Sequence, residues 1–318
     1  MASKYTTDDM TNRYLFRNAI AGNRYQAFLD IPVLDCFHFV PPSHPNPHTN
    51  FITAELERCL SHWNLNFLVN FHYVYYDTVV RLFYANGYID GRGNYKSYLF
   101  GKEIIVSESL LCDLFQLGDF GLDEYVGVSA GTVGGAFTIT PLPFVRMEDQ
   151  AKILRHVTKN YEFTHPTLFY PSLRGMFDII DRILVPKRFN EINLMNAYYL
   201  RHIWHLEKQI NIPYVIIQHM NSVKSHMLYL PYGNMITSIC IHFGIQIPFE
   251  EMRMPCKRSQ NILSANGLRE YGLYPHANGW YIRDPSPMYI LPHLDENGNA
   301  IPDTKAINFI CPNFAKRS

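Results

Sequence analysis

The chain has 318 residues, a formal net charge of zero, 47% hydrophobic residues and 18% charged residues. This length is enough for one large domain or two modest ones. The aromatic content of 14% argues against a disordered chain, and the zero net charge argues against a protein that coats nucleic acid through charge alone. Because the start has no apolar signal region and no run approaches about 18 apolar residues, the sequence predicts an intracellular protein without a membrane span, in the nucleus or the cytoplasm.

Six cysteines are scattered along the chain, and no Cys-x-x-Cys pair occurs. The spacing therefore signals neither a zinc ribbon nor a redox dithiol. Several of the cysteines fall inside apolar helical stripes, where a thiol behaves as a small hydrophobic side chain. The six are Cys36, Cys59, Cys112, Cys240, Cys256 and Cys311.

Residues 1–50 are predicted to be an N-terminal arm and a proline-rich linker. Phe39–Asn50 contains four prolines, which is typical of an extended connection. A short helix is expected to start near Tyr14–Phe16. The stretch Arg24–Phe39 is then expected to lie along the surface of the main body.

A folded domain is predicted over residues 51–258, and its first lobe is predicted at 51–118. The first helix of this lobe presents an apolar face that includes Trp63. A second helix is expected to run to about Ala85 and to stop in a left-handed turn at Asn86–Gly87.

A strand pair and a third helix are predicted to complete the first lobe. Tyr95–Phe100 and Lys102–Ser107 flank Gly101, which indicates a β-hairpin. Ser107 is expected to cap the helix that follows, and Gly118 is expected to end it.

Residues 119–144 are predicted to be a long loop that joins the two lobes and serves as their hinge. The loop is acidic at first and then glycine-rich through Gly131–Gly135. This GTVGG run lacks the Gly-Lys-Ser/Thr ending that phosphate binding requires, so a flexible loop is the favoured interpretation. A further helix is expected at about Glu148–Asn160.

The second lobe, residues 145–258, is predicted to be a tightly packed set of helices. Proline near the start and glycine just past the end mark the last of them. Asp178 and Asp181 are expected on a solvated face of the first, beside two arginines. Apolar residues recur at helical spacing in four segments, at 173–184, 192–206, 213–227 and 231–243.

Three stretches of these lobes read VVRLFYANGYIDGRGNYKSYLFGKEIIVSESLLCDLFQL, LMNAYYLRHIWHLEKQINIPYVIIQHM and LPYGNMITSICIHFGIQIP. Together they resemble the plant transposon protein domain, a family found in open reading frames associated with plant retroelements. The resemblance covers roughly Phe51–Met254. It implies a retrotransposon-derived helical domain whose motifs are helix faces, caps and turns, and it carries over no catalytic residue.

Residues 259–318 are rich in glycine, proline and asparagine, and they are predicted to form an irregular C-terminal extension with one or two small strands. The sequence as a whole therefore predicts a mainly α, multi-helix globular domain with a small β-hairpin in its N-terminal lobe. Charge is uneven along it, with an acidic excess at 107–150 and a basic excess at 151–258. Either the two regions complement each other within one fold, or a basic face of the helical lobe binds phosphate.

Histidine offers the most obvious candidate metal ligands. His202 and His205 lie three apart on one predicted helix, and His219, His226 and His242 follow. A metal site needs converging ligands, and His-x-x-His without a nearby glutamate in the zinc-hydrolase pattern is a weak signal. The favoured interpretation is histidines on polar faces that are exposed or singly hydrogen-bonded.

The signatures of common active sites are missing, including Gly-x-Ser-x-Gly and the zinc knuckle. We therefore predict no catalytic, cofactor-binding or metal site and no cofactor. The favoured function is a non-enzymatic, retroelement-derived structural or interaction domain that self-associates or binds protein or nucleic acid. Two alternatives stay open: a metal-dependent enzyme or metal-binding protein that uses the core histidines, and a relic without a selected function.

Overall fold

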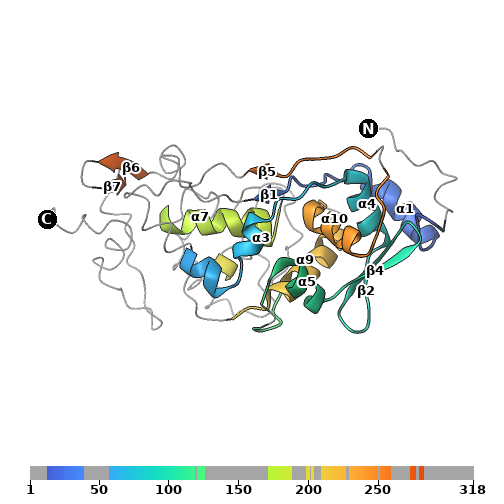
Figure 1. Cartoon of the computed structure of the whole chain (residues 1–318), viewed down its shortest axis with the longest axis horizontal. Helices are drawn as coiled ribbons and strands as arrows, with labels where there is room; N and C mark the ends of the chain where they lie inside the picture. The colour runs from blue at the N-terminus through green and yellow to red at the C-terminus, as the bar shows by residue number, and fades with distance from the viewer. Residues whose placement is uncertain are drawn as a thin grey trace.

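The computed structural model in Figure 1 describes several separate ranges of the chain. The predicted proline-rich linker, the glycine-rich part of the loop, the helix at 148–160 and most of the C-terminal extension lie outside them. The structure describes the backbone but not the side chains at 171–174, 223, 226, 258, 273–276 and 279–282. The described ranges are 13–38, 57–118, 120–125, 171–187, 198–200, 202–203, 209–226, 229–248, 251–258, 273–276 and 279–282.

Helices predominate in the described part of the chain, and the strands are short, which confirms the mainly α prediction. A π-helical turn, η3, continues α7, and residues 57–62, 198–200 and 202–203 are also helical. The helices are α1 (Ala19–Phe28), α3 (Asn66–Asn70), α4 (Asp77–Asn86), α5 (Glu108–Phe115), α7 (Pro171–Ile179), η3 (Ile180–Leu184), α9 (Ile212–His226) and α10 (Gly233–His242). The strands are β1 (Phe37–His38), β2 (Tyr88–Ile89), β3 (Tyr95–Leu99), β4 (Lys102–Val106), β5 (Lys257–Arg258), β6 (Leu273–His276) and β7 (Gly279–Ile282).

The predicted hairpin is present as β3 and β4, which pair antiparallel from Leu99↔Lys102 to Tyr95↔Val106. Phe100 and Gly101 make its turn with φ of 47° and 81°, the left-handed pair that suits a two-residue hairpin. The short strand β2, which the sequence did not predict, adds to the other edge of β3. The Ser97 hydroxyl donates to the Phe83 carbonyl at 2.7 Å, so α4 is fastened to the sheet.

The helix caps of this region agree with the prediction at one end only. The Ser107 hydroxyl accepts from the Leu110 amide at 3.1 Å, which confirms it as the N-cap of α5. The end of α4 at Asn86 agrees with the predicted end at about Ala85, but the left-handed turn predicted there is wrong, since Gly87 has φ of −71° and the chain passes directly into β2. The stop predicted at Gly118 is also wrong, because α5 ends at Phe115 and the left-handed residue that follows it is Gln116, with φ of 53°.

Gly87 is needed for close packing instead of for a left-handed turn. A Cβ atom there would lie 1.9 Å from the hydroxyl oxygen of Tyr95. The Gly87 carbonyl also accepts from Lys224 at 3.1 Å and from Arg24 at 3.3 Å. Cations at the last carbonyls of a helix are favourable, and here they join α1 and α9 to the end of α4.

Part of the N-terminal arm lies in the core, so the prediction that Arg24–Phe39 lies along the surface is wrong for Tyr25 and Phe28. Tyr25 and Phe28 are buried where α1 packs on α4. The Leu34 amide donates to the Leu230 carbonyl, and the Leu230 amide donates to the Pro32 carbonyl, both at 2.9 Å. Because α1 has few apolar residues in a regular pattern, its sequence gave little sign of this burial.

One buried hydrophobic cluster draws on both predicted lobes. It runs through the chain from Leu15 to Ile245, and α4 packs on α10 while α5 packs on α9, as Figure 1 shows. The third and fourth predicted helices of the second lobe are confirmed as α9 and α10. Gly244, with φ of 67°, follows the end of α10 as expected. None of the described helices is long and apolar enough to cross a membrane.

Candidate functional site

The helix that begins at Pro171 ends in a π-helical turn, a feature that is rare and often found at functional sites. The Val185 amide donates to the Ile180 carbonyl at 2.8 Å, five residues back instead of four. In the widened turn Asp181 faces the core and is only 4% exposed. The prediction that Asp181 lies on a solvated face is therefore wrong, because a regular α-helical period does not hold through this turn.

Asp181 forms a buried ion pair with Lys187. The lysine Nζ lies 3.2 Å from the carboxylate, and the two side chains are 7% and 5% exposed. Burial raises the pKa of Asp181 to about 6, and the Lys187 charge opposes that shift. A buried pair of this kind contributes little net stability, but the loss of one partner leaves an uncompensated charge.

His219 on α9 is fully buried and uses both ring nitrogens. Its Nε2 lies 2.9 Å from the Pro186 carbonyl, and its Nδ1 lies 3.0 Å from the Tyr125 hydroxyl. Because a carbonyl only accepts, Nε2 carries the proton and Nδ1 accepts from the tyrosine. Burial lowers the pKa of His219 to about 4, so the ring is neutral near pH 7.

We call Asp181, Lys187, Pro186, His219 and Tyr125 the polar junction. It joins η3, α9 and the start of the predicted interlobe loop. The expectation of exposed or singly bonded histidines is wrong for His219, whose two bonds connect segments 33 and 94 residues away. Both nitrogens of the ring are therefore engaged within the protein.

The other candidate histidines do not gather around His219. His202 is half-buried and packs its ring on Tyr198, with centroids 4.5 Å apart, and His242 lies exposed at the end of α10. His205 and the side chain of His226 lie outside the described residues. Within the described part of the chain, no three histidine, cysteine, aspartate or glutamate side chains come together in a way that could hold a metal ion.

The start of the predicted loop is docked on the helices by a series of bonds. Leu122 pairs with the backbone before α9, because its amide donates to the Gln209 carbonyl at 3.0 Å and its carbonyl accepts from the Asn211 amide at 3.1 Å. The Glu124 carboxylate accepts from the Tyr198 hydroxyl. Residues 120–125 of the predicted loop are thus docked on the helices, and the rest of the loop lies outside the described residues.

Asn211 helps to hold this segment in place, and its role is not apparent from the sequence. Its side-chain amide donates to Glu108 at 2.7 Å and to Asp123 at 2.8 Å, while its side-chain oxygen accepts from the Tyr214 amide at 3.1 Å. It is thus the N-cap of α9. An asparagine two residues before Pro213 is a recognisable cap signal, but its acidic partners could not be inferred from local sequence.

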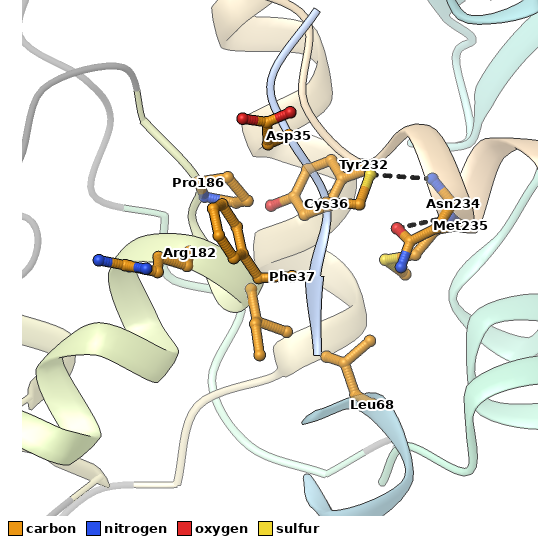
Figure 2. Close-up of a pocket in the computed structure, with 10 residues that line it drawn as sticks. Asp35, Cys36, Phe37, Leu68, Arg182, Pro186, Tyr232, Asn234 and Met235 are labelled. Atoms are coloured by element: carbon orange, nitrogen blue, oxygen red, sulfur yellow. Dashed lines mark hydrogen bonds between the residues drawn. The ribbon is translucent and has the colours of Figure 1, made fainter. Parts of the chain in front are cut away.

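A small cavity lies beside the π-helical turn, between β1 and α10 (Figure 2). Its volume of about 20 Å³ is enough for one water molecule. Asp35 on its wall is paired with Lys257 at 2.6 Å, and the Arg182 guanidinium stacks over the Phe37 ring at 4.9 Å. No ionised side chain of the polar junction lines this cavity; Pro186 is the residue the two share.

No family model, no curated protein and no solved structure matches this chain. In the polar junction a carboxylate, an ammonium group and an imidazole each contact a neighbouring segment of the same chain. Such an arrangement fixes segments of the chain relative to one another.

Proposed function

We propose that this protein is a non-enzymatic structural and interaction domain, of the retroelement-derived kind that its sequence resembles, and that it acts mainly by self-association. The observation that supports this proposal is the use of its buried polar groups. Asp181 and His219, two acid–base groups whose pKa values burial shifts to about 6 and about 4, are both engaged in internal bonds. A general acid or base instead needs access to a bound substrate.

Self-association is favoured over binding to nucleic acid for two reasons. The net charge of zero provides little long-range attraction to phosphate. Several large apolar side chains are also exposed on different elements, including Ile20 at 67%, Met252 at 56% and Ile241 at 44%. Contact with a second protein surface would remove this apolar area from water, which is favourable.

Light scattering across a concentration series tests the proposal directly. We expect the weight-average mass of the full chain to rise from one copy toward two or more as concentration increases. Titrations with single-stranded and double-stranded nucleic acid at two salt concentrations should show little binding. A mass that stays at one copy at every concentration would overturn the proposal of self-association. Tight, salt-sensitive binding to nucleic acid would indicate a nucleic-acid-binding function instead.

The metal-dependent alternative has a separate test. Elemental analysis of the purified chain should show no stoichiometric zinc, iron or manganese. One equivalent of any of these, lost after substitution of His202 or His205, would revive that alternative.

A further inference from the structure

Two cysteines that lie 220 positions apart in the sequence meet at the parallel pair of β1 and β5. The strand register is Phe37↔Lys257 and His38↔Arg258, and the Lys257 amide donates to the Cys36 carbonyl at 2.8 Å. This register places Cys36 directly opposite Cys256. Neighbouring strands lie about 4.8 Å apart, which is within the roughly 4.4–6.8 Å between Cα atoms that a disulfide spans.

Both sulfur atoms lie on the same side of this pair, against one residue of α10. The Asn234 amide donates to the Cys36 sulfur at 3.2 Å, and the Asn234 side-chain nitrogen lies 4.0 Å from the Cys256 sulfur. Figure 2 shows the Cys36 sulfur directed at Asn234. Both cysteines are free thiols, Cys36 buried and Cys256 half-buried.

We propose that Cys36 and Cys256 form a dithiol pair that a low-molecular-weight disulfide, such as oxidised glutathione, converts into an intramolecular disulfide. The bond would covalently join the N-terminal arm to the strand that follows the helical core. In a reducing compartment the same pair remains as two thiols, which agrees with the free thiols of the structure.

The chemistry proceeds in two exchange steps. The thiolate of Cys256, the more accessible residue, attacks one sulfur of the glutathione disulfide, forms a mixed disulfide and releases one glutathione thiolate. The thiolate of Cys36 then attacks the Cys256 sulfur and releases the second glutathione thiolate. Two protein thiols and one glutathione disulfide thus give one protein disulfide and two glutathione thiols.

The environment of the two thiols makes this exchange slow near pH 7. Burial raises the pKa of Cys256 to about 11 and that of Cys36 to about 12. Since only the thiolate reacts, the rate should rise about tenfold for each pH unit well below these values. The pair therefore responds to sustained oxidation and not to a brief pulse.

The test incubates the full chain with oxidised glutathione, blocks remaining thiols, digests without reduction and maps the linked peptides by mass spectrometry. We expect one dominant link, between Cys36 and Cys256, with two fewer titratable thiols per chain. The closed form should melt roughly 5–10 °C higher, since the link constrains a long loop of the unfolded chain.

Three variants complete the test. Cys36→Ala and Cys256→Ala should each abolish the link, whereas Cys240→Ala, which removes another buried thiol, should retain it. The mapping on the unsubstituted chain stands even if a variant fails to fold. A dominant link to any other cysteine, or a glutathione adduct on Cys256 that never closes, would overturn the proposal.

Discussion

The region of α4, β3 and β4 and the polar junction are both buried, yet different forces hold them together. The first is packed from apolar and aromatic side chains, such as Phe83 and Tyr95, whose rings stack with centroids 5.3 Å apart. The second depends on a charged pair and a doubly bonded histidine. In an apolar region, the stability lost on substitution increases with the volume that is left empty or overfilled. In a polar region, removal of a single partner leaves a buried charge without compensation and costs much of the stability at once.

The largest effect is expected from breaking the ion pair of the polar junction. Lys187→Ala leaves the Asp181 carboxylate buried without its partner, so the free energy of unfolding should fall by about 3–5 kcal/mol. Urea unfolding measures the change. The double variant Asp181→Leu with Lys187→Met should recover most of the loss, and a loss below about 1 kcal/mol for Lys187→Ala would contradict the buried pair.

The pH dependence of stability separates the two titrating groups of the junction. The pKa of His219 is about 4 in the folded protein, below its ordinary 6.5, so the unfolded chain binds more protons between these values and stability falls as pH decreases. The pKa of Asp181 is about 6, above its ordinary 3.8, so the folded chain binds more protons and stability falls as pH increases. Between pH 4 and 6 the two effects oppose each other.

Single substitutions should separate the two contributions to the pH dependence of the free energy of unfolding. In Asp181→Asn the histidine effect remains, and stability should fall on acidification by up to about 1.4 kcal/mol per pH unit. His219→Gln should show a slope of the opposite sign. Denaturant titrations at intervals between pH 4.5 and 6 provide the measurement. If the free energy of unfolding changed with pH in the same way in both variants and in the unsubstituted protein, these residues would not titrate as the structure requires.

In the apolar region the equivalent test is steric. Gly87→Ala places a Cβ against the Tyr95 ring and should cost about 1–3 kcal/mol of stability. Tyr95→Phe removes the nearest atom, and it should recover part of this loss. On its own Tyr95→Phe should be close to neutral, since this hydroxyl is buried without a hydrogen-bond partner in the described structure. Additive effects in the double-mutant cycle would argue against the contact.

The smallest effect is expected at the helix cap between these regions. Ser107→Ala removes the bond to the Leu110 amide and should lower the free energy of unfolding by about 1 kcal/mol. Ser225→Ala is the matched control, because its hydroxyl donates to the Asn221 carbonyl on the exposed face of α9. If both variants lost the same free energy of unfolding, Ser107 would not act as a stabilising N-cap.

The same comparison shows how much the sequence could predict. The strand pair around Gly101, the Ser107 cap and the end of α10 before Gly244 were recoverable because each depends on residues within a few positions of one another. The π-helical turn was not, since nothing in the apolar spacing of α7 marks an extra residue in its last turn. Asp181 was therefore assigned to the wrong face.

The candidate site was less predictable than the fold. His219 finds its partners at Pro186 and Tyr125, and Asn211 finds an acidic partner at Glu108, 103 residues away. Cys36 and Cys256 are further apart still. A local sequence pattern identifies residue types that could bond, but only the packing of α5, α9 and α10 determines which of them meet.

If the buried acid–base groups of this protein hold its segments together, the His219 imidazole must stay neutral and hydrogen-bonded at both nitrogens, and nuclear magnetic resonance can detect this state. The nitrogen and proton shifts of the ring report both the tautomer and the titration. We expect a neutral ring protonated on Nε2, with no titration between pH 5 and 8. A ring that titrates near 6.5, or one protonated on Nδ1, would contradict it.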